Sequence, residues 1–363
     1  MNKQKESYKV IALMSGTSLD GLDIACIQFK AQKSQWTHSI ICAETLDYSN
    51  EIGNMLSTIE RANGNALIKA HFQYGHYLGE QASIFIKENH LGDIDFIASH
   101  GHTIFHQPDL QFTFQLGHGA AIAASSKNIV ISDFRSLDVA LGGEGAPLVP
   151  LGDRLLFSEY GACVNLGGIA NISFDETTQR RGFDVCAVNM VLNHLCQTEL
   201  QLPFDQGGNI ARSGKFSTAL FEKLNSLSFF KKLPPKSLGK EWVFTELIPL
   251  LNEAPIPIQD KLHTFCHHVA EQLQTVIHTS NLQDPILFTG GGALNSYLME
   301  CIKLKVPRVH VPHRNTIDFK EAIIFGLLGV LRIREEENSL MSITGAESDS
   351  SGGSIYLPPC SKQ

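Results

Sequence analysis

Residues 10–29 most constrain the fold, because two apolar segments flank a short polar turn that contains glycine. Residues 10–14 are all apolar and predict a buried strand. Residues 22–29 are mostly apolar and β-branched, and they predict a second strand. Between them, Gly16 and Gly21 permit positive φ angles and a close approach of the backbone to a ligand. The stretch therefore predicts a β-hairpin whose turn is suited to ligand contact.

Two interpretations of this turn are open on the residues alone. Its successive N–H groups can form an anion-binding nest, and Asp20 or Asp23 could hold a hydrated Mg²⁺ beside a phosphate. Alternatively, the segment is an ordinary Gly/Ser/Asp hairpin turn. A Walker A loop is excluded, because Gly-Lys-Ser/Thr is absent and the next element is predicted to be a strand rather than a helix.

The size and charge of the chain narrow the classes of function. Its 363 residues are enough for two domains that each bury a core. The net charge of −8 offers no basic surface, so no nucleic-acid partner is expected. The polar start leads into too few apolar residues for a secretory segment, and the longest apolar run, 322–331, is too short to cross a membrane. We therefore expect no membrane partner.

The cysteines predict a reducing compartment, here the cytoplasm, because they show no paired spacing and mostly lie in apolar runs. They are Cys26, Cys42, Cys163, Cys186, Cys196, Cys266, Cys301 and Cys360. His263, His267 and His268 surround Cys266 and could be taken for a metal cluster. They lie in a predicted amphipathic helix, and no second group of ligands is evident, so we interpret them as ordinary helix residues.

Two further glycine turns follow predicted strands. Residues 162–174 form a second strand–turn–strand pattern around Gly167 and Gly168, and residues 285–289 predict a strand that ends in Gly290–Gly292 before a helix. Single glycine turns are common in mixed-sheet proteins. Two hairpins, each opening one half of the chain, nevertheless suggest a duplicated fold that holds nucleotide phosphates, with the triple-glycine turn packed under a base or ribose.

Polar residues follow two other predicted strands. His100 comes directly after the strand 95–99, and ligands sit at the carboxyl ends of strands in α/β sheets, so it is a candidate for substrate contact. The alternative is a turn with satisfied histidines. Arg135 could clamp a carboxylate with two hydrogen bonds, or it could form a salt bridge with Asp133 or Asp138.

Two carboxylates in the second half have both a functional and a structural interpretation. Asp184 is the candidate for proton transfer, but it also precedes a predicted helix at 188–195 that it could stabilise. Glu321 is a candidate for substrate contact, but its spacing also fits a capping box ahead of the helix 322–331. The acidic, Ser/Gly-rich tail 336–363 is expected to be solvated or partly disordered.

The order and the amino-acid sequences of these motifs resemble those of the anhydro-N-acetylmuramic acid kinases. Those are sugar kinases of the actin, hexokinase and heat-shock-chaperone ATPase superfamily. The motifs that carry the resemblance over nearly the whole chain are Ser15-Gly-Thr-Ser-Leu-Asp-Gly21, His100-Gly-x-Thr103, Asp133-Phe-Arg135, Gly142-Gly-x-Gly-Ala-Pro147, Asn165-Leu-Gly-Gly-Ile-Ala-Asn-Ile172, Phe183-Asp184, Asp205-x-x-Gly-x-x-Ala211 and Thr289-Gly-Gly-Gly-Ala293.

The resemblance implies an α/β fold with two domains, a duplicated ribonuclease H-like (actin-like ATPase) architecture, and a nucleotide cleft between the domains. The halves would be 1–145, with loops that line the substrate, and 146–335, with the turn that binds adenosine, followed by the tail 336–363. Because members of the family pair as dimers, a homodimer is expected.

The resemblance also implies that ATP and Mg²⁺ are used, and it suggests which residues form the site. The residues expected to bind ATP and Mg²⁺ are Gly16, Thr17, Ser18, Leu19, Asp20, Gly21, Asp23, Gly167, Gly168, Asn171, Gly290, Gly291 and Gly292. Asp20 would hold Mg²⁺ together with the phosphates of ATP. The general base would be Asp184, and the residues near the sugar would be Arg135, His100 and Glu321.

The implied activity is an ATP-dependent sugar kinase that converts 1,6-anhydro-N-acetylmuramic acid to N-acetylmuramic acid 6-phosphate in peptidoglycan recycling. The anhydro sugar has no free hydroxyl at position six, so its ring must open as it is phosphorylated. A carboxylate deprotonates water, the water attacks the anomeric carbon, and the departing bridge oxygen attacks the γ-phosphorus. This chemistry needs a base, Mg²⁺ and hydrogen-bond donors around the phosphates.

The chain departs from the family pattern near the catalytic carboxylate. It has Val185–Asn189 (Val-Cys-Ala-Val-Asn) where Thr-Gly-Pro-Gly-Asn is expected, Asn193 in place of a usual Asp, Lys240 in place of a usual Arg, and His118 where Asp is common. Val188 is expected to be helical, where a glycine would cost up to about 1 kcal/mol. The departures leave two alternatives open: a kinase for another anhydro or amino sugar, or a non-catalytic ATP-binding sensor.

Overall fold

The computed structural model describes residues 5–16, 19, 21–32, 35–177, 179–234 and 236–358. Its contacts divide the chain into unit 1, Met1–Leu156 with Phe319–Gln363, and unit 2, Phe157–Asp318. Unit 2 is therefore inserted into unit 1, and the chain passes between them twice. The second passage lies in α13 (Arg314–Arg334) at Phe319, whose φ of −111° and ψ of 15° interrupt the helix.

Unit 1 is built on a mixed sheet with the strand order β12-β6-β4-β1-β2-β3, and β5 pairs with β4 on one side. Strands β1, β2 and β3 are antiparallel, whereas β4 is parallel to β1, and β6 is parallel to β4. The strands are β1 Ser7–Ser15, β2 Leu22–Gln32, β3 Gln35–Leu46, β4 Phe96–Gln107, β5 Phe112–Leu116, β6 Val130–Ser132 and β12 Ser354–Tyr356. Besides the later part of α13, the helices are α1 Asn50–Thr58, α2 Gly64–Glu88, α3 Gly119–Ser126, α4 Ser136–Ala140, α5 Val149–Leu156 and α14 Met341–Thr344.

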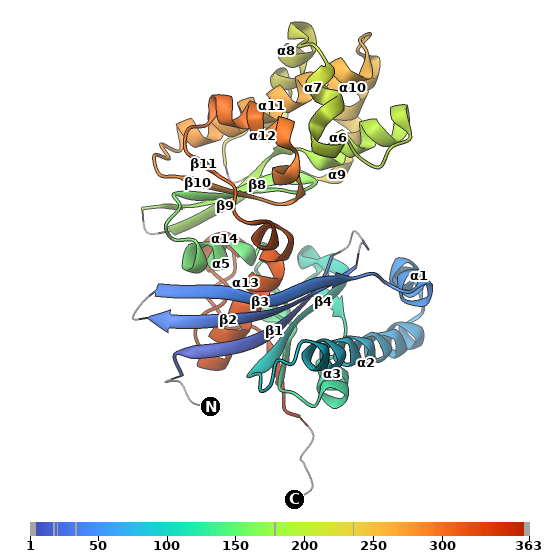
Figure 1. The fold of residues 1–363 in the computed structure, drawn as a ribbon, viewed down its shortest axis with the longest axis vertical. Coiled ribbons are helices and arrows are strands. Elements are labelled where there is room, and N and C mark those ends of the chain that lie inside the picture. Colours follow the sequence, from blue (N-terminus) through green and yellow to red (C-terminus); the bar gives the residue numbers. More distant parts are fainter. Residues whose placement is uncertain are drawn as a thin grey trace, which may run out of the picture. The chain divides into compact units, whose positions relative to one another are not determined.

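Helices pack on both faces of this sheet, which explains why its central strand β1 is buried from Val10 to Ser15. On one face, Ile11 and Leu13 of β1 share a core with Tyr74 of α2, and Figure 1 shows α2 and α3 side by side. On the other face, α13 approaches closely enough that the ring of Phe96 lies against Gly329. The hairpin predicted from the sequence is thus the centre of the unit 1 core.

Unit 2 is built on a second mixed sheet, with the strand order β11-β10-β7-β8-β9. The strands are β7 Ala162–Leu166, β8 Ile169–Glu176, β9 Gln179–Ala187, β10 Ile286–Thr289 and β11 Val309–His310. The helices are α6 Asn189–Leu195, α7 Asn209–Ser213, α8 Thr218–Ser226, α9 Lys240–Trp242, α10 Ile248–Glu253, α11 Ile258–Thr279 and α12 Ser296–Lys305.

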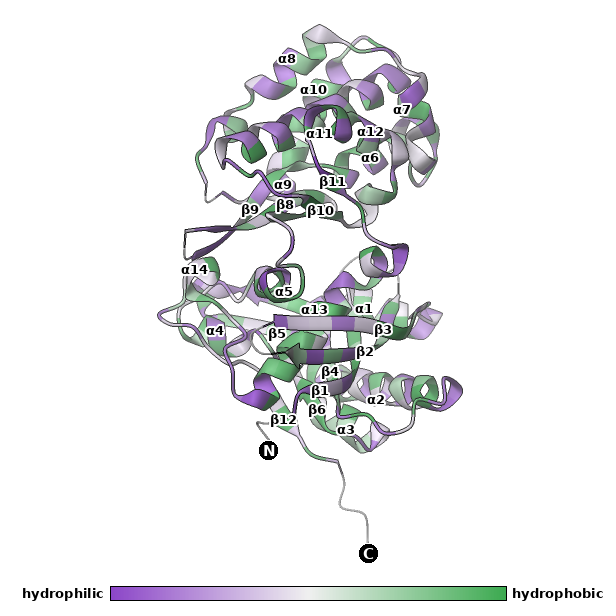
Figure 2. Ribbon diagram, turned by 60° about the vertical axis from the view of Figure 1, so that its left-hand side comes forward, coloured by the Kyte–Doolittle hydropathy of each residue, from purple (hydrophilic) through white to green (hydrophobic). Residues whose placement is uncertain are grey.

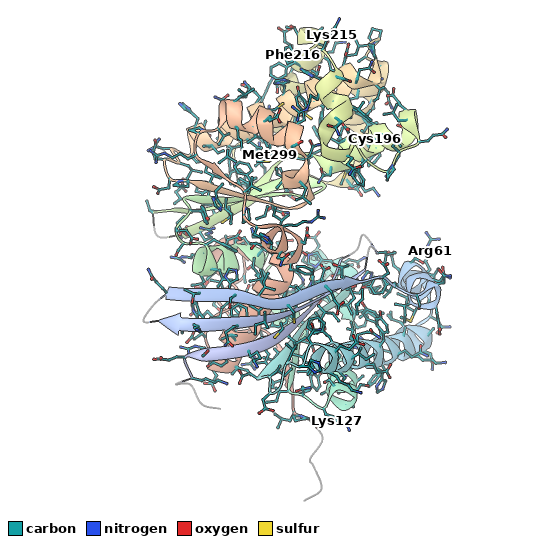
Figure 3. The ribbon with its side chains drawn as sticks, viewed as in Figure 1. Arg61, Lys127, Cys196, Lys215, Phe216 and Met299 are labelled. Carbon is teal, nitrogen blue, oxygen red and sulfur yellow. The ribbon has the colours of Figure 1, made fainter. Side chains whose placement is uncertain are left out.

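The helices of unit 2 lie on one face of its sheet in Figure 1. Val164 of β7 and Phe288 of β10 belong to the same core as Phe265 of α11. Figure 2 shows that hydrophilic and hydrophobic residues are interspersed along α11, as expected for a helix with one buried side. Cys196 and Met299, labelled in Figure 3, are buried in this core.

The two sheets repeat one topology, which confirms the expected duplicated, ribonuclease H-like α/β fold. In each unit, three antiparallel strands follow one another along the chain, and the first of them pairs in parallel with a later strand. One more parallel strand lies beyond that later strand, β6 in unit 1 and β11 in unit 2. The glycine turns β1–β2 and β7–β8 occupy equivalent positions in the two repeats.

The sequence-based elements differ from the structure in two places near the candidate site. The strand expected to end at Ser99 continues through His100 to Gln107, because β5 pairs with its second half. Val188 is not helical, since its φ of −134° and ψ of −96° precede the start of α6. Because Val188 is fully buried, a glycine there would cost the free energy of a cavity rather than of helix propensity.

The compact units do not coincide with the expected halves 1–145 and 146–335 or with the expected tail 336–363. The C-terminal residues return to unit 1, where β12 pairs with β6 and the side chains of Asn338 and Thr344 are buried. Within the described ranges, no helix is both long and apolar enough to cross a membrane. The cysteines in those ranges form no disulfide bonds, whereas Cys360 lies outside them.

Candidate functional site

Four polar side chains form a row across the sheet of unit 2. The register pairs Thr289 of β10 with Asn165 of β7, Asn165 with Asn171 of β8, and Asn171 with Asp184 of β9. Opposite residues of antiparallel strands place their side chains on one face, with Cβ atoms roughly 4.5–5.5 Å apart. The row therefore brings Asp184, the expected base, next to Asn171, one of the residues expected to bind ATP.

A β-bulge in β9 decides which face Asp184 occupies. Cys186 pairs with Ala170, but the next residue of β8, Asn171, pairs with Asp184, so Val185 is the extra residue. An uninterrupted register would turn Asp184 to the opposite face, under the helices. The bulge instead exposes the carboxylate on the face that carries the polar row.

The Asp184 carboxylate is half-buried and accepts two hydrogen bonds. Its Oδ2 accepts from the backbone N–H of Leu238 at 2.9 Å and from the hydroxyl of Ser237 at 3.3 Å. Burial raises the pKa of Asp184, and these two donors only partly oppose the rise. Asp184 lies within β9 rather than at the start of a helix, so the helix-stabilising interpretation is wrong. A raised pKa suits a carboxylate that takes up a proton.

The start of α6 holds the turn between β7 and β8. The carbonyl of Gly168 accepts hydrogen bonds from the backbone of Val188 at 2.8 Å and Met190 at 3.2 Å, and that of Gly167 accepts from Asn189 at 3.2 Å. A trans peptide directs its N–H opposite to its carbonyl, so the N–H of Gly168 points away from α6. Gly168 is exposed, and its N–H can therefore serve an anionic oxygen.

The triple-glycine turn packs tightly on one side and is open on the other. Gly290 has a φ of 80°, and a Cβ there would lie 2.6 Å from Asn165 Oδ1 and 2.8 Å from the carbonyl carbon of Leu166, so only glycine fits. Gly291 is exposed, and a Cβ on it would meet only the Asn189 side chain, at 3.7 Å. Gly291 thus offers open backbone on which a base or ribose can pack.

The β1–β2 turn of unit 1 carries the other residues expected to bind phosphate. The carbonyl of Gly16 accepts from the N–H of Leu19 at 3.3 Å, and Gly21 has a φ of 148°, in the region that favours glycine. Asp23 Oδ1 accepts a 2.6 Å hydrogen bond from the hydroxyl of Thr45, its partner on β3. Thr17, Ser18 and Asp20 lie outside the described residues.

Arg135 is held by a histidine and a carbonyl. His100 Nδ1 donates to the carbonyl of Gly101 at 2.9 Å, and its Nε2 accepts from Arg135 Nε at 3.1 Å and Nη2 at 2.9 Å. Arg135 Nη1 donates to the carbonyl of Gly145 at 2.7 Å. Burial and the charge of Arg135 hold the pKa of His100 well below its usual range, so the ring stays neutral and can accept. Three of the five guanidinium N–H bonds are engaged by these contacts.

The loop that holds Arg135 is itself held by the C-terminal segment. The buried carboxylate of Asp138 accepts from the backbone N–H of Gly145 at 2.8 Å, the hydroxyl of Ser339 at 2.6 Å and the hydroxyl of Thr344 at 2.8 Å. Residues 201 and 206 positions further along the chain therefore hold the residue whose carbonyl orients Arg135.

Glu321 lies on α13, and its negative charge raises the pKa of Arg135 against the effect of burial, which lowers that pKa to about 10. α13 is interrupted at Phe319, so Glu321 lies in the first turn of the helical segment that follows, and the capping-box interpretation stays a prediction. The Glu321 side chain is exposed. Arg135 and Glu321 thus form an electrostatic pair beside His100.

A cavity of about 150 Å³ in unit 1 adjoins His100 and the N-terminus of α3. Its lining is His71, His100, Thr113, Phe114, Gln115, Gly117, His118, Gly119, Ser132, Asp133, Ser136 and Tyr356. His118 Nδ1 accepts the N–H of Ala120 at 3.1 Å and caps α3, and its ring stacks on Phe72. An imidazole therefore makes the capping contact that an Asp could make at this position.

The histidines of α11 have partners within unit 2. His263 Nδ1 lies 3.0 Å from the carbonyl of Ala211 and 2.9 Å from the hydroxyl of Tyr297, and His268 Nδ1 lies 2.7 Å from Asn225 Oδ1. Among the described residues, no group of three or more metal-binding side chains is present.

Sequence reasoning did not single out Asn165 as part of the site, and it named Asp138 only as a salt-bridge partner for Arg135, not as the residue that holds the loop at Gly145. The signal for Asn165 is a polar residue between Val164 and Leu166 in an otherwise apolar strand, which marks the opposite face. Asp138 carried no such signal, because its hydroxyl partners lie far along the chain.

Residues 8–358 of the chain match the family model described as "Anhydro-N-acetylmuramic acid kinase". A relative of that name from Bacillus thuringiensis subsp. konkukian (strain 97-27) is 30% identical, covering 96% of this chain and 99% of its own. Another, from Francisella tularensis subsp. novicida (strain U112), is 32% identical and covers 93% of this chain and 96% of its own. Among solved structures, the activator of the 2-hydroxyisocaproyl-CoA dehydratase from Clostridium difficile with bound ADPNP has a TM-score of 0.43 at 15% identity, covering 88% and 93% of the two chains.

Proposed function

Because the chain belongs to the anhydro-N-acetylmuramic acid kinase family, we propose that it opens 1,6-anhydro-N-acetylmuramic acid and phosphorylates it with ATP. The product is N-acetylmuramic acid 6-phosphate, and the reaction serves peptidoglycan recycling. The observation that carries this proposal is Asp184, a half-buried carboxylate of raised pKa in a polar row beside two glycine turns.

Asp184 is the general base of this reaction. Its ionised carboxylate takes a proton from water, and the resulting hydroxide bonds to the anomeric carbon as the bond to the bridge oxygen breaks. The bridge oxygen bonds to the γ-phosphorus, and ADP leaves. The donors from Ser237 and Leu238 hold the carboxylate in place through Oδ2, and the other oxygen, Oδ1, is available to the water.

The glycine turns receive the nucleotide. The outward N–H of Gly168 and the turn Gly16–Gly21 suit phosphate oxygens, and the open backbone at Gly291 suits the adenosine. Asp20 is the proposed Mg²⁺ ligand, since carboxylate oxygens suit this hard cation. Mg²⁺ supplies neutralisation of phosphate charge when bound.

Arg135, His100 and Glu321 receive the sugar. His100 and Gly145 hold the guanidinium in one orientation, which leaves two N–H bonds for an acceptor on the substrate. Arg135 keeps its positive charge at neutral pH, because its lowered pKa of about 10 is still well above 7. A carboxylate on the sugar is the acceptor best matched to this group.

Sugar-dependent release of ADP tests the proposal. Purified protein with Mg²⁺ and ATP should release ADP only when 1,6-anhydro-N-acetylmuramic acid is added, and a phosphorylated, ring-opened product should accumulate. ADP release with a different anhydro or amino sugar alone would point to the related-kinase alternative. ATP binding without turnover on any of these sugars would favour the alternative of a non-catalytic ATP-binding sensor.

A homodimer in the cytoplasm is part of the same proposal. The homodimer rests on the family resemblance, and light scattering of the purified protein tests it. The cytoplasm is supported by thiols that lie buried in both cores, such as Cys26, Cys186 and Cys266.

A further inference from the structure

Ser15, the last residue of β1, lies at the centre of a chain of hydrogen bonds. Its Oγ lies 2.7 Å from the hydroxyl of Tyr48 and 2.8 Å from Nδ1 of His102. The Tyr48 hydroxyl lies 3.0 Å from that of Tyr74. The four residues come from β1, the loop after β3, α2 and β4, so the network joins four parts of unit 1 at one hydroxyl.

Ser15 is also the residue from which the β1–β2 turn begins. It pairs with Leu22 in the antiparallel ladder, and the turn Gly16–Gly21 lies between them. It pairs with His102 in the parallel ladder, where the register shifts after Leu13. The network therefore fixes Ser15, the residue directly before Gly16 and the turn.

The network is electrically neutral. Burial raises the pKa of Tyr74 well above its usual value and lowers the pKa of His102, so the phenol stays protonated and the imidazole uncharged. All three hydrogen bonds can form at once without a charged group when Tyr74 donates to Tyr48, Tyr48 donates to Ser15, and Ser15 donates to His102. A neutral network neither attracts nor repels phosphate, so its effect on a nucleotide must be positional.

We propose that Tyr48 and His102 are positioning residues for ATP binding, because they hold Ser15, the residue from which the β1–β2 turn begins. The inference rests on the proposed function in one respect, that this turn contacts the nucleotide. Neither residue touches ATP itself. Loss of either contact should weaken ATP binding and leave the affinity for the sugar unchanged.

Two pairs of variants test the inference. Tyr48→Phe removes the donor to Ser15, and Tyr77→Phe is its matched control, because Tyr77 stacks on Tyr74 in the same cluster but makes none of the three hydrogen bonds. His102→Leu removes the acceptor, whereas His102→Asn keeps an amide near the position of Nδ1. The measurements are the ADP dissociation constant by calorimetry, KM for ATP and for the anhydro sugar, and the melting temperature.

Tyr48→Phe and His102→Leu should raise the ADP dissociation constant and KM for ATP by about 3–10-fold, the effect of one lost hydrogen bond. Tyr77→Phe and His102→Asn should match the wild type, and KM for the sugar should not move. Unchanged nucleotide affinity in both disruptive variants would overturn the inference, as would an equal loss in Tyr77→Phe. If the wild type binds ADP but phosphorylates no anhydro sugar, the proposed function fails, while the calorimetry still decides the role of the network.

Discussion

Asp184 lies directly opposite Asn171 across β8 and β9, and it does so because Val185 bulges out of the register. A one-residue change of register moves a side chain to the other face of a sheet. The position of this carboxylate therefore depends on a local backbone irregularity at Val185.

Replacing Asp184 by Asn should separate catalysis from stability. The variant keeps the size and the acceptor for the N–H of Leu238 but cannot take up a proton. Phosphoryl transfer to the anhydro sugar should fall by roughly 10²–10⁴-fold, the usual contribution of a general base. ADP affinity should hardly change. A variant with normal turnover per folded molecule would remove Asp184 from the mechanism.

The acid side of the pH–rate profile should report the raised pKa of Asp184. The base works only when ionised, so kcat/KM should rise with pH through this pKa, at a higher pH than an ordinary Asp would give. The stability effect has the opposite direction. Because the folded state favours the protonated form, wild-type stability relative to Asp184→Asn should fall as pH rises between the unfolded and folded pKa values. Denaturant melts of both proteins across this range check the sign.

Local sequence patterns predicted the hairpins because apolar runs and glycine turns act over a few residues. The segments 10–14 and 162–166 accordingly lie in strands. The side-chain network at Ser15 and the loop contact from Thr344 to Asp138 could not be predicted in this way. Their partners are set by the packing of distant elements, and no short-range pattern records which hydroxyl will meet which ring.

Glycine substitutions should distinguish folding from nucleotide contact in the triple-glycine turn. Gly291→Ala adds a methyl that meets only the Asn189 side chain at 3.7 Å, so stability should not change, whereas KM for ATP should rise if adenosine packs there. Gly290→Ala should cost about 1–3 kcal/mol, because its Cβ would overlap Asn165 and its φ is positive.

Gly345→Ala is the control for the cost of a positive φ angle alone, since Gly345 has a φ of 76° but open space around an added Cβ. Thermal melts and ATP titrations of the three variants complete the test. A loss of stability in Gly291→Ala, or ATP kinetics unchanged by it, would argue against adenosine packing at this turn.

Arg135→Lys should weaken sugar binding without a comparable effect on ATP. An ammonium cannot engage His100 and Gly145 in fixed directions and still present two N–H bonds to the substrate. We expect KM for the anhydro sugar to rise by about 10–100-fold, as for a lost charged hydrogen bond. Arg181→Lys is the matched control, because Arg181 pairs with Glu176 at the exposed end of β9. Equal sugar kinetics in both variants would rule out Arg135 as a substrate residue.

Thr344→Val should reveal the link between the C-terminal segment and Arg135. The substitution keeps the shape and removes a hydroxyl donor to the buried Asp138, at a cost of about 1–3 kcal/mol. Because Asp138 also holds Gly145, KM for the sugar should rise together with the loss of stability. Thr344→Ser keeps the hydroxyl and should resemble the wild type in urea melts and in kinetics. Sugar kinetics unaffected by a destabilising Thr344→Val would show that the loop holds Arg135 unaided.

The insertion of unit 2 between Leu156 and Phe319 has a consequence during synthesis on the ribosome. All of unit 2 emerges before the later part of α13 and strand β12, which complete the sheet and its second helical layer in unit 1. The first 156 residues must therefore wait with one face of their sheet uncovered while the inserted unit is made. A nascent chain halted before residue 319 would contain a complete unit 2 and an unfinished unit 1, with the apolar face around Phe96 open to chaperones.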